Sequence, residues 1–454
     1  MEVDEFNTNQ VCSDCHYCLS DGQAPVKLCG LGNMSNPCRL KHMVVNQRTI
    51  RRCTNPFNDC AALSRLAEAK ENSPAVADMV TKAVGSFRHV LFVGHDDRVW
   101  QVSWDPSGTR LASCSGDKSA RVWSAISGAN FFTSTAMEVD GSRSTLASTW
   151  QCVDVIDNAH KRTVRSVAFE PTRGRAIATA SFDGTTAIWE KTDESTDSYE
   201  CVATLEGHEN EAKCVAWAPS GQLLATCGRD KSVWIWESTG EGDFDCISVL
   251  MEHTQDVKMV LWHPKQELLA SFSYDDTIRI WKEDDDDWVS ASTISGHTST
   301  VWAGAFSPKG EYLASVSDDR TVRVWMQNAV QENGSEEGFY YRPDTSYKCV
   351  AVMPDSVHSR AIYSISWCAS VAGEQSANTD LGFLATGSGD NSVRILSVSR
   401  KEATTTDLDV ALVCTQENAH GLSDINCVQW NPKYPGWLAT SGDDGVIRIW
   451  HLEL

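Results

Sequence analysis

The feature that most constrains the fold of this chain is a tryptophan that recurs with an aspartate six residues before it. The pairs are Asp117/Trp123, Asp183/Trp189, Asp230/Trp236, Asp275/Trp281, Asp319/Trp325 and Asp444/Trp450. A seventh aspartate, Asp390, keeps the spacing but is followed by Leu396. A histidine precedes each aspartate by 22 to 24 residues, or by 32 in the sixth copy: His95, His160, His208, His253, His297, His358 and His420. The chain therefore contains seven copies of one structural unit.

The third copy, residues 207–236, shows what one unit can fold into. An alternating apolar run ends at Trp217, a second run covers Leu223–Thr226, and a third ends at Trp236. Three strand-forming runs separated by short turns predict an antiparallel meander. A single meander exposes two edges and cannot bury its own faces, so it requires neighbours of the same kind. Repeats at roughly 45-residue spacing predict a β-propeller.

These copies resemble the WD-repeat family, although few of them keep both a Gly-His pair and the closing Trp. The resemblance implies a structural network in which His, Asp and Trp are joined to a Ser or Thr of the second strand. The expected partners are residues such as Ser115, Ser181, Ser273, Ser317 and Ser388, and the most complete sets are His95/Asp117/Trp123, His208/Asp230/Trp236 and His297/Asp319/Trp325. Buried polar groups must be paired. We therefore interpret these histidines as scaffold and not as catalytic residues.

The two ends of the repeat region predict how the ring closes. The sequence stops at Leu454, four residues after Trp450, so the last meander lacks an outer strand. The run Phe87–Val93, just before the first histidine, has no other partner and is expected to supply it. A ring closed in this way has no long exposed edge. We predict an all-β fold: a seven-bladed WD-repeat propeller over residues 87–454, preceded by a Cys-rich extension and linker at 1–86.

Composition limits the classes of partner. The chain has 61 acidic and 39 basic residues, a formal net charge of −22. Nucleic acids and anionic membranes both require a dense cationic surface, so neither is expected as a partner. An apolar run of about 18 residues is absent, as is a signal-peptide pattern, so we expect a soluble intracellular protein. In a reducing compartment the ten cysteines of the repeats are interpreted as small apolar residues.

Residues 1–60 differ in kind from the repeats because they hold seven cysteines. The spacing of Cys12, Cys15 and Cys18, with Cys29 beyond them, would let thiolates converge on one metal ion. A zinc-stabilised module is one hypothesis, since a stretch with few large apolar residues needs a staple to fold. A poorly ordered extension with incidental cysteines is the other, and an iron–sulfur cluster is a third. No cofactor is expected in the propeller.

Binding residues of a propeller are expected around the central channel. Two positions of each repeat crown one face in WD-repeat proteins: the residue after the aliphatic that opens the first strand, and the residue before the turn Asp. These positions place four cations and three aromatics together: Arg165, Phe182, Lys213, Arg229, Lys258, Tyr274 and Trp302. We call these seven residues the rim cluster.

The rim cluster predicts a binding site for an acidic peptide with an aromatic anchor, or for a free C-terminal carboxylate. Arg and Lys pair with carboxylates, and buried aromatic side chains dominate binding energy. The alternative is that these side chains lie over the rim or pair with local acids such as Glu209 and Glu211. No Gly-rich phosphate loop, nucleophile elbow or HExxH helix occurs, so an enzyme is not expected.

Three blocks carry a closer resemblance: Glu200–Glu237, His253–Trp281 and Asp287–Trp325. They resemble the WD-repeat subunits of the cytosolic iron–sulfur protein assembly (CIA) targeting complex. The resemblance implies a non-catalytic cytosolic adaptor that, with other targeting subunits, recognises client apoproteins, partly through acidic, aromatic-ended tails. The Cys-rich extension, the loops at 124–156 and 369–380, and Leu396 depart from that family. The polar segments 124–156 and 326–350 separate blades, and with 369–380 they are expected to be surface loops. A ubiquitin-ligase substrate receptor is the alternative function, and an additional nuclear location stays open.

Overall fold

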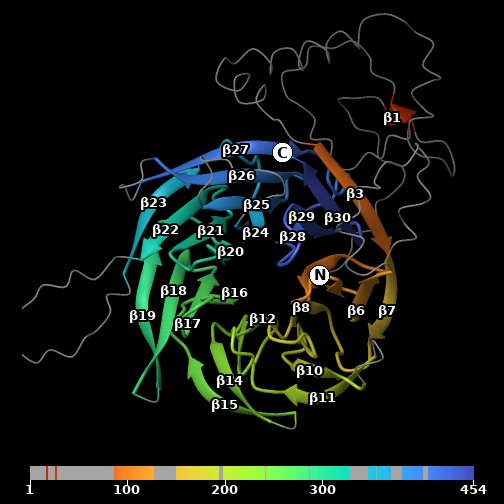
Figure 1. The fold of residues 1–454 in the computed structure, drawn as a ribbon, viewed down its shortest axis with the longest axis vertical. Coiled ribbons are helices and arrows are strands. Elements are labelled where there is room, and N and C mark those ends of the chain that lie inside the picture. Colours follow the sequence, from red (N-terminus) through yellow and green to blue (C-terminus); the bar gives the residue numbers. More distant parts are fainter. Residues whose placement is uncertain are drawn as a thin grey trace, which may run out of the picture. The chain divides into compact units, whose positions relative to one another are not determined.

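The computed structural model describes residues 86–126, 150–193, 198–240, 242–285, 287–327, 346–353, 355–369, 381–401 and 407–453, together with two short strands near the N-terminus. The chain forms two compact units, Met1–Ser73 and Pro74–Leu454. In the first unit, β1 (Tyr17–Cys18) pairs antiparallel with β2 (Val26–Lys27). In the second unit, the described strands form seven four-stranded sheets arranged as a ring (Figure 1).

Each sheet is one blade of the propeller. Blade 1 consists of β4 (Val99–Trp104), β5 (Arg110–Ser115), β6 (Ala120–Ala125) and β7 (Trp150–Ile156); blade 2 of β8 (Val164–Phe169), β9 (Ala176–Ser181), β10 (Thr186–Lys191) and β11 (Tyr199–Leu205); blade 3 of β12 (Ala212–Trp217), β13 (Leu223–Gly228), β14 (Val233–Gly240) and β15 (Asp243–Leu250). Blade 4 consists of β16 (Val257–Trp262), β17 (Leu268–Ser273), β18 (Thr277–Asp284) and β19 (Asp287–Ser295); blade 5 of β20 (Val301–Phe306), β21 (Tyr312–Ser317), β22 (Val322–Gln327) and β23 (Tyr347–Met353). Blade 6 consists of β24 (Ile362–Cys368), β25 (Gly382–Ser388), β26 (Val393–Arg400) and β27 (Leu408–Gln416); blade 7 of β28 (Ile425–Trp430), β29 (Trp437–Gly442), β30 (Val446–Glu453) and β3 (Ser86–Val93).

Blade 7 closes the ring with strands from both ends of the repeat region. Strand β3 pairs antiparallel with β30, in a register that sets Phe87 opposite Leu452 (Figure 1). Phe92 at the end of β3 then packs on blade 1, where its ring lies 5.6 Å from Trp123 and 5.2 Å from Trp150. The seven-bladed all-β fold and its closure by an N-terminal strand are therefore confirmed.

The apolar core lies between neighbouring blades. One cluster, for example, combines Val233 and Ile235 of blade 3 with Trp262 and Leu269 of blade 4, all of them buried. Burying each large apolar side chain contributes about 1.5–3 kcal/mol. Because every blade shares such a layer with the next, no blade is stable without its neighbours. The described residues contain no helix long and apolar enough to cross a membrane.

A buried hydrogen-bond network recurs in each blade, and blade 4 illustrates it. The His253 ring bonds Asp275 through Nδ1 at 2.8 Å and Ser271 through Nε2 at 2.7 Å. The Trp281 indole donates to the same Ser271 hydroxyl at 2.8 Å. The sequence-based choice of Ser273 as this partner was wrong. Ser273 instead accepts a hydrogen bond from the backbone N–H of Asp275 at 3.1 Å.

The same displacement occurs in the other blades. The hydroxyl partners of the histidines are Ser113, Thr179, Thr226, Ser271, Ser315, Thr386 and Thr440. In five blades each lies two residues before the serine expected from sequence, namely Ser115, Ser181, Ser273, Ser317 and Ser388. Residues two apart point to the same face of a strand, so spacing alone did not distinguish them.

Several sequence-based hypotheses concern other parts of the chain. Cys12, Cys15 and Cys29 lie outside the described residues, and only the backbone of Cys18, in β1, is described. The segment 124–156, interpreted from sequence as a connection between blades, contains the outer strand β7. The segment 326–350 likewise contains the start of β23. Both correct the sequence-based view that these segments are surface loops throughout.

Candidate partner-binding site

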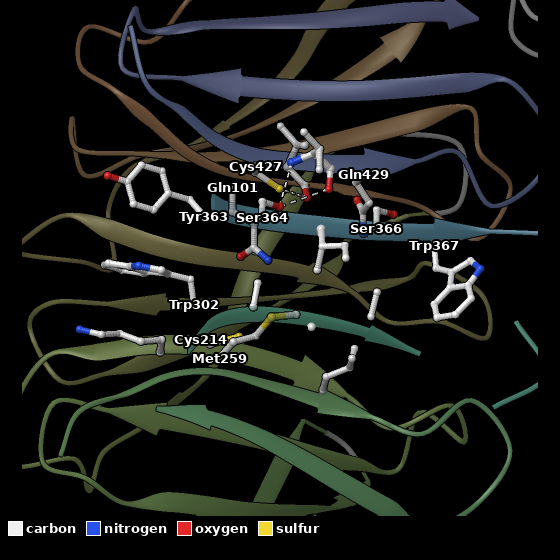
Figure 2. A pocket seen from close by; sticks show the side chains of 18 of the residues that line it. Gln101, Cys214, Met259, Trp302, Tyr363, Ser364, Ser366, Trp367, Cys427 and Gln429 are labelled. Carbon is white, nitrogen blue, oxygen red and sulfur yellow. Dashed lines mark hydrogen bonds between the residues drawn. The ribbon is translucent and has the colours of Figure 1, made fainter. Parts of the chain in front are cut away.

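All seven residues of the rim cluster line two cavities at one mouth of the central channel. A cavity of about 320 Å³ is lined by Arg165, Lys213, Lys258 and Trp302, with Trp100 and Tyr363 beside them. A second cavity, of about 300 Å³, is lined by Phe182, Lys213, Arg229 and Tyr274. Lys213 belongs to both cavities and so joins them. Figure 2 shows Trp302 and Tyr363 at one end of the first cavity and Trp367 at the other.

A β-bulge in every blade directs one side chain toward this mouth. In each blade the pairing of the first and second strands shifts by one residue, for example between Val257 and Met259. The skipped residues are Trp100, Arg165, Lys213, Lys258, Trp302, Tyr363 and Asn426. A bulged residue is released from the ladder and its side chain is re-aimed. Because the bulge interrupts the in-and-out alternation of the strand, these side chains do not point into the core between the blades.

Two lysines of the cluster share one carboxylate. Asp256 Oδ2 lies 2.7 Å from Lys213 Nζ and 3.4 Å from Lys258 Nζ. Burial acts to raise the pKa of Asp256, but the Lys213 hydrogen bond and both lysine charges outweigh it, so this pKa lies below its usual range. One positive charge of the pair is therefore left without a matching negative charge.

Lys258 is held between two aromatic rings. Its ammonium lies 4.9 Å from the centre of the Tyr274 ring and 5.1 Å from that of Trp302. Burial, together with the nearby charge of Lys213, lowers the pKa of Lys258 to about 8. Aromatic faces attract a cation but do not neutralise it. The site therefore holds a partly desolvated ammonium that an incoming anion would stabilise.

Arg165 is the least compensated cation of the site. Its guanidinium lies 4.8 Å from the centre of the Trp100 ring. Within the described part of the chain it forms no hydrogen bond and no ion pair. Burial lowers its pKa, although a guanidinium stays charged in proteins. The indole Nε1 atoms of Trp100 and Trp302 are also buried and have no hydrogen-bond partner among the described residues. Three donor groups thus lie unpaired in one cavity.

The second cavity is better balanced. Glu211 accepts from Arg229 at 3.2 Å and from Arg162 at 3.1 Å. Arg162 also lies over the Phe182 ring at 5.9 Å. The alternative that local acids pair with the rim is therefore correct for Arg229 with Glu211, and for Lys213 and Lys258 with Asp256. It does not extend to Glu209, whose backbone N–H bonds Asp230.

Charge is distributed unevenly around the mouth. Blades 2 to 4 supply the cations Arg162, Arg165, Lys213, Arg229 and Lys258 against the carboxylates Glu211 and Asp256. On blades 5 to 7, Asp318 and Asp424 lie near Tyr363, and Arg360 pairs with Asp424 at 3.0 Å. Burial and the two carboxylates raise the pKa of the Tyr363 phenol, while the charge of Arg360 acts against this shift. A ligand with a negative end would be oriented toward blades 2 to 4. Sequence reasoning missed Arg162 and Asp256 because neither occupies a position that recurs among binding residues of the repeat.

Comparison with known proteins places the chain in a family. The model described as WD domain, G-beta repeat matches residues 85–124, 150–190, 199–237, 244–282, 288–326 and 412–451. A relative from Cryptococcus neoformans, "Probable cytosolic iron-sulfur protein assembly protein 1", is 34% identical over 436 residues, covering 79% of this chain and 97% of that protein. A Caenorhabditis elegans relative, "Probable cytosolic iron-sulfur protein assembly protein CIAO1 homolog", is 37% identical over 376 residues, with 82% and 99% covered. This chain belongs to the cytosolic iron–sulfur protein assembly family of WD-repeat proteins.

A further relative covers most of this chain, and one blade of the chain departs from the repeat pattern. The Mycosarcoma maydis relative, "Probable cytosolic iron-sulfur protein assembly protein 1", is 40% identical over 441 residues, with 82% of this chain and 94% of that protein covered. The repeat model leaves residues 327–411 unmatched, an interval that holds most of blade 6. There Leu396 replaces the tryptophan, yet His358 still bonds Asp390 at 3.0 Å and Thr386 at 2.8 Å. Blade 6 is thus formed although Leu396 stands in the place of its closing tryptophan.

Proposed function

We propose that this protein is a non-catalytic adaptor of cytosolic iron–sulfur protein assembly. In this proposal the rim cluster binds an acidic, aromatic-ended tail of a client apoprotein, and other surfaces bind further targeting subunits. The relatives carry the name of that assembly process, which supports the cellular role. The observation that carries the binding proposal is the excess of unpaired donors in the channel mouth: Arg165 and the indoles of Trp100 and Trp302.

The chemistry of the mouth suits a carboxylate ligand. A peptide carboxylate has two oxygens, which suit a guanidinium fork and an adjacent indole N–H at once. Lys213 and Lys258 together carry one positive charge beyond Asp256 and can take a second carboxylate. Tyr274, 55% exposed beside the second cavity, offers an aromatic face to an aromatic ligand side chain.

An adaptor function is also consistent with how the His and Asp residues of the repeats are used. In each pair the aspartate is part-buried and bonds the histidine, whose second nitrogen bonds a hydroxyl. No substrate could reach these rings without opening a blade. Among the described residues, several cationic and aromatic groups at the channel mouth have no partner, which suits binding.

Charge reversal of Lys213 is the direct test. We expect Lys213→Glu to weaken binding of a short fluorescent peptide ending in Asp-Glu-Trp about a hundredfold, since it removes one cation and sets a second anion beside Asp256. Affinity is measured by fluorescence anisotropy, and circular dichroism checks the fold. The control, Lys309→Glu, makes the same charge change in the exposed turn between β20 and β21, at the opposite ends of the strands.

Two results would contradict the proposal. Equal affinity of Lys213→Glu and the unmodified protein would remove the rim as the binding site. An equal loss in Lys309→Glu would show that only net charge matters. In addition, isolating the tagged protein from its own cells and identifying bound proteins by mass spectrometry tests the cellular role: iron–sulfur assembly factors are expected, whereas cullin-type ligase components would favour the ubiquitin-ligase alternative.

A further inference from the structure

Two cysteines of blade 3 face each other across neighbouring strands. Cys214 of β12 and Cys227 of β13 are direct partners in the antiparallel register. Their thiols point the same way, toward the first strand of blade 4: Cys214 Sγ donates to Val260 O at 3.7 Å and Cys227 Sγ to Val257 O at 3.6 Å. Among the described cysteines they are the only two in such a register.

The other cysteines on paired strands provide a contrast. Cys152, Cys201 and Cys246 are exposed on outer strands, and each lies opposite a tryptophan in the register. These thiols have access to solvent, but none of them has a second thiol opposite it in the register. Cys214 is 5% exposed and lines the channel cavity (Figure 2), with the fully buried Cys227 behind it. Cys427 lines the same cavity but lies opposite Ser441 in the register, so only Cys214, among the described cysteines, combines contact with the cavity and a thiol partner.

The two thiols differ in acidity. A hydrogen bond with Cys227 outweighs burial and, with the charge of Arg165 nearby, lowers the pKa of Cys214 to about 7. Burial and the hydrogen bond with Cys214 raise the pKa of Cys227. Of the two thiols, Cys214 is therefore the more acidic and Cys227 the less acidic. This is the division between an attacking and a resolving thiol.

We propose that Cys214 and Cys227 form a peroxide-reactive dithiol inside the channel. The Cys214 thiolate attacks one oxygen of hydrogen peroxide, the O–O bond breaks, and hydroxide leaves and takes a proton to become water. Cys214 is thereby oxidised to a sulfenic acid. The Cys227 sulfur then attacks the Cys214 sulfur, the S–O bond breaks, and a second water leaves with the Cys227 proton. In sum, two thiols and one peroxide yield one disulfide and two waters.

The backbone geometry permits this bond with a small movement. Directly opposite residues of an antiparallel pair have Cβ atoms about 4.5–5.5 Å apart. A disulfide requires about 3.5–4.5 Å. Closing the bond therefore draws β12 and β13 together by about 1 Å. In a reducing compartment such a bond is expected to be transient.

The consequence for the rim cluster rests on the proposed function. Lys213 immediately precedes Cys214 in the bulge of β12, and Arg229 follows Cys227 by two residues. The disulfide would thus tighten the two strand ends that carry these cations. It would shift Lys213 relative to Asp256, which belongs to the loop before blade 4. Oxidation is therefore expected to weaken binding of an acidic peptide, by about threefold to tenfold.

The experiment uses the full-length protein and graded hydrogen peroxide. Trypsin cleaves after Lys213 and after Arg229, so both thiols lie in one peptide, residues 214–229. After alkylation under denaturing conditions, the disulfide form of this peptide carries no alkyl group, and it is two hydrogens lighter than the reduced peptide. We expect this form at peroxide levels that leave Cys114 and Cys427, both buried and without a thiol partner in register, fully alkylated.

Two variants complete the test. Cys227→Ser removes the resolving thiol, so Cys214 should accumulate as a sulfenic acid that dimedone traps, whereas Cys214→Ser should give neither product. Two alkyl groups on the 214–229 peptide, at peroxide levels that oxidise the exposed Cys152, would overturn the assignment. A disulfide that forms but leaves peptide affinity unchanged would overturn the coupling alone. If Lys213→Glu has no effect on peptide binding, the proposed function itself is contradicted, whatever the state of the two thiols.

Discussion

The interior of each blade and the rim cluster both contain polar side chains, but they differ in whether those side chains find partners within the protein. Inside blade 4, His253, Asp275 and Ser271 bond one another, and the hydrogen-bonding capacity of each ring and carboxylate is used within the protein. At the channel mouth, Arg165 has no ion pair within the described residues, and Lys213 and Lys258 share one carboxylate. The difference lies in whether the protein supplies the partner.

That difference assigns each region its role. A buried polar group without a partner costs about 1–3 kcal/mol, so a paired network stabilises the fold mainly because breaking it is expensive. At the rim, the indole Nε1 atoms of Trp100 and Trp302 are buried without a partner among the described residues, and Arg165 and Lys258 are partly desolvated. Their unsatisfied capacity is available to a ligand. The paired networks therefore act as scaffold, and under the proposed function the unpaired donors of the rim are the groups that a ligand would satisfy.

The largest effect is expected inside the blade. Asp275→Ala removes the acceptor of the His253 ring and of the Thr254 and Thr277 backbone N–H groups. We expect the free energy of unfolding to fall by about 3 kcal/mol, measured by urea denaturation. A loss below about 1 kcal/mol, the size expected for an exposed ion pair, would show that the network and the rim do not differ in kind.

The same variant has a defined pH dependence. Burial acts to raise the pKa of Asp275, but hydrogen bonds from His253 and Thr277 outweigh it, so the folded-state pKa lies well below the usual range. The stabilisation is therefore fully present above the unfolded-state pKa of about 4 and is lost as the pH falls below it. The stability difference between Asp275→Ala and the unmodified protein should shrink in acid and stay constant between pH 6 and 8.

The second effect is the same substitution made at the rim. Asp256→Ala removes the carboxylate that competes with a ligand for Lys213 and Lys258. We expect affinity for the acidic peptide to rise about tenfold, while the free energy of unfolding changes by about 1 kcal/mol or less, as for partly exposed ion pairs. Higher peptide affinity in Asp256→Ala and lower stability in Asp275→Ala, from the same kind of substitution, would sharpen the comparison. A destabilisation as large as that of Asp275→Ala would break it.

The smallest effect comes from titration of Lys258. With a pKa near 8, this side chain is charged below that pH and increasingly neutral above it. Affinity for the acidic peptide should therefore fall about threefold to tenfold between pH 7 and pH 9. Lys258→Gln should bind weakly at pH 7 and lose most of this dependence. If the variant keeps the full pH dependence, another group is responsible for it.

Much of the fold could be predicted from the sequence because its determinants are periodic. The Asp–Trp spacing identified six blades, and Asp390 identified the seventh despite Leu396. The partner of β30 could be predicted because the run at Phe87 had no other place. The hydroxyl of the network could not be chosen correctly between Ser271 and Ser273, since both lie on one face of β17.

The candidate site was harder to read for a different reason. Sequence position identified the rim cluster, and the structure places all seven residues at one mouth. Sequence could not show that Arg229 is paired with Glu211 while Arg165 is not, because these contacts join separate strands and blades. The bulges that release Lys213 and Lys258 from the ladder could not be predicted from the sequence either. Pairing across space depends on register, which spacing within one repeat does not specify.

By itself the sequence determined the number of blades, the His, Asp and Trp residues of the buried network and the seven residues of the rim cluster. Each of these follows from local spacing, because strands and turns impose their periods on neighbouring residues. Only the tertiary structure decided which cations keep a partner and that the thiols of Cys214 and Cys227 face each other. The physical reason is that a hydrogen bond or an ion pair spans only about 3 Å. Such a contact therefore depends on which strands the closed ring places side by side.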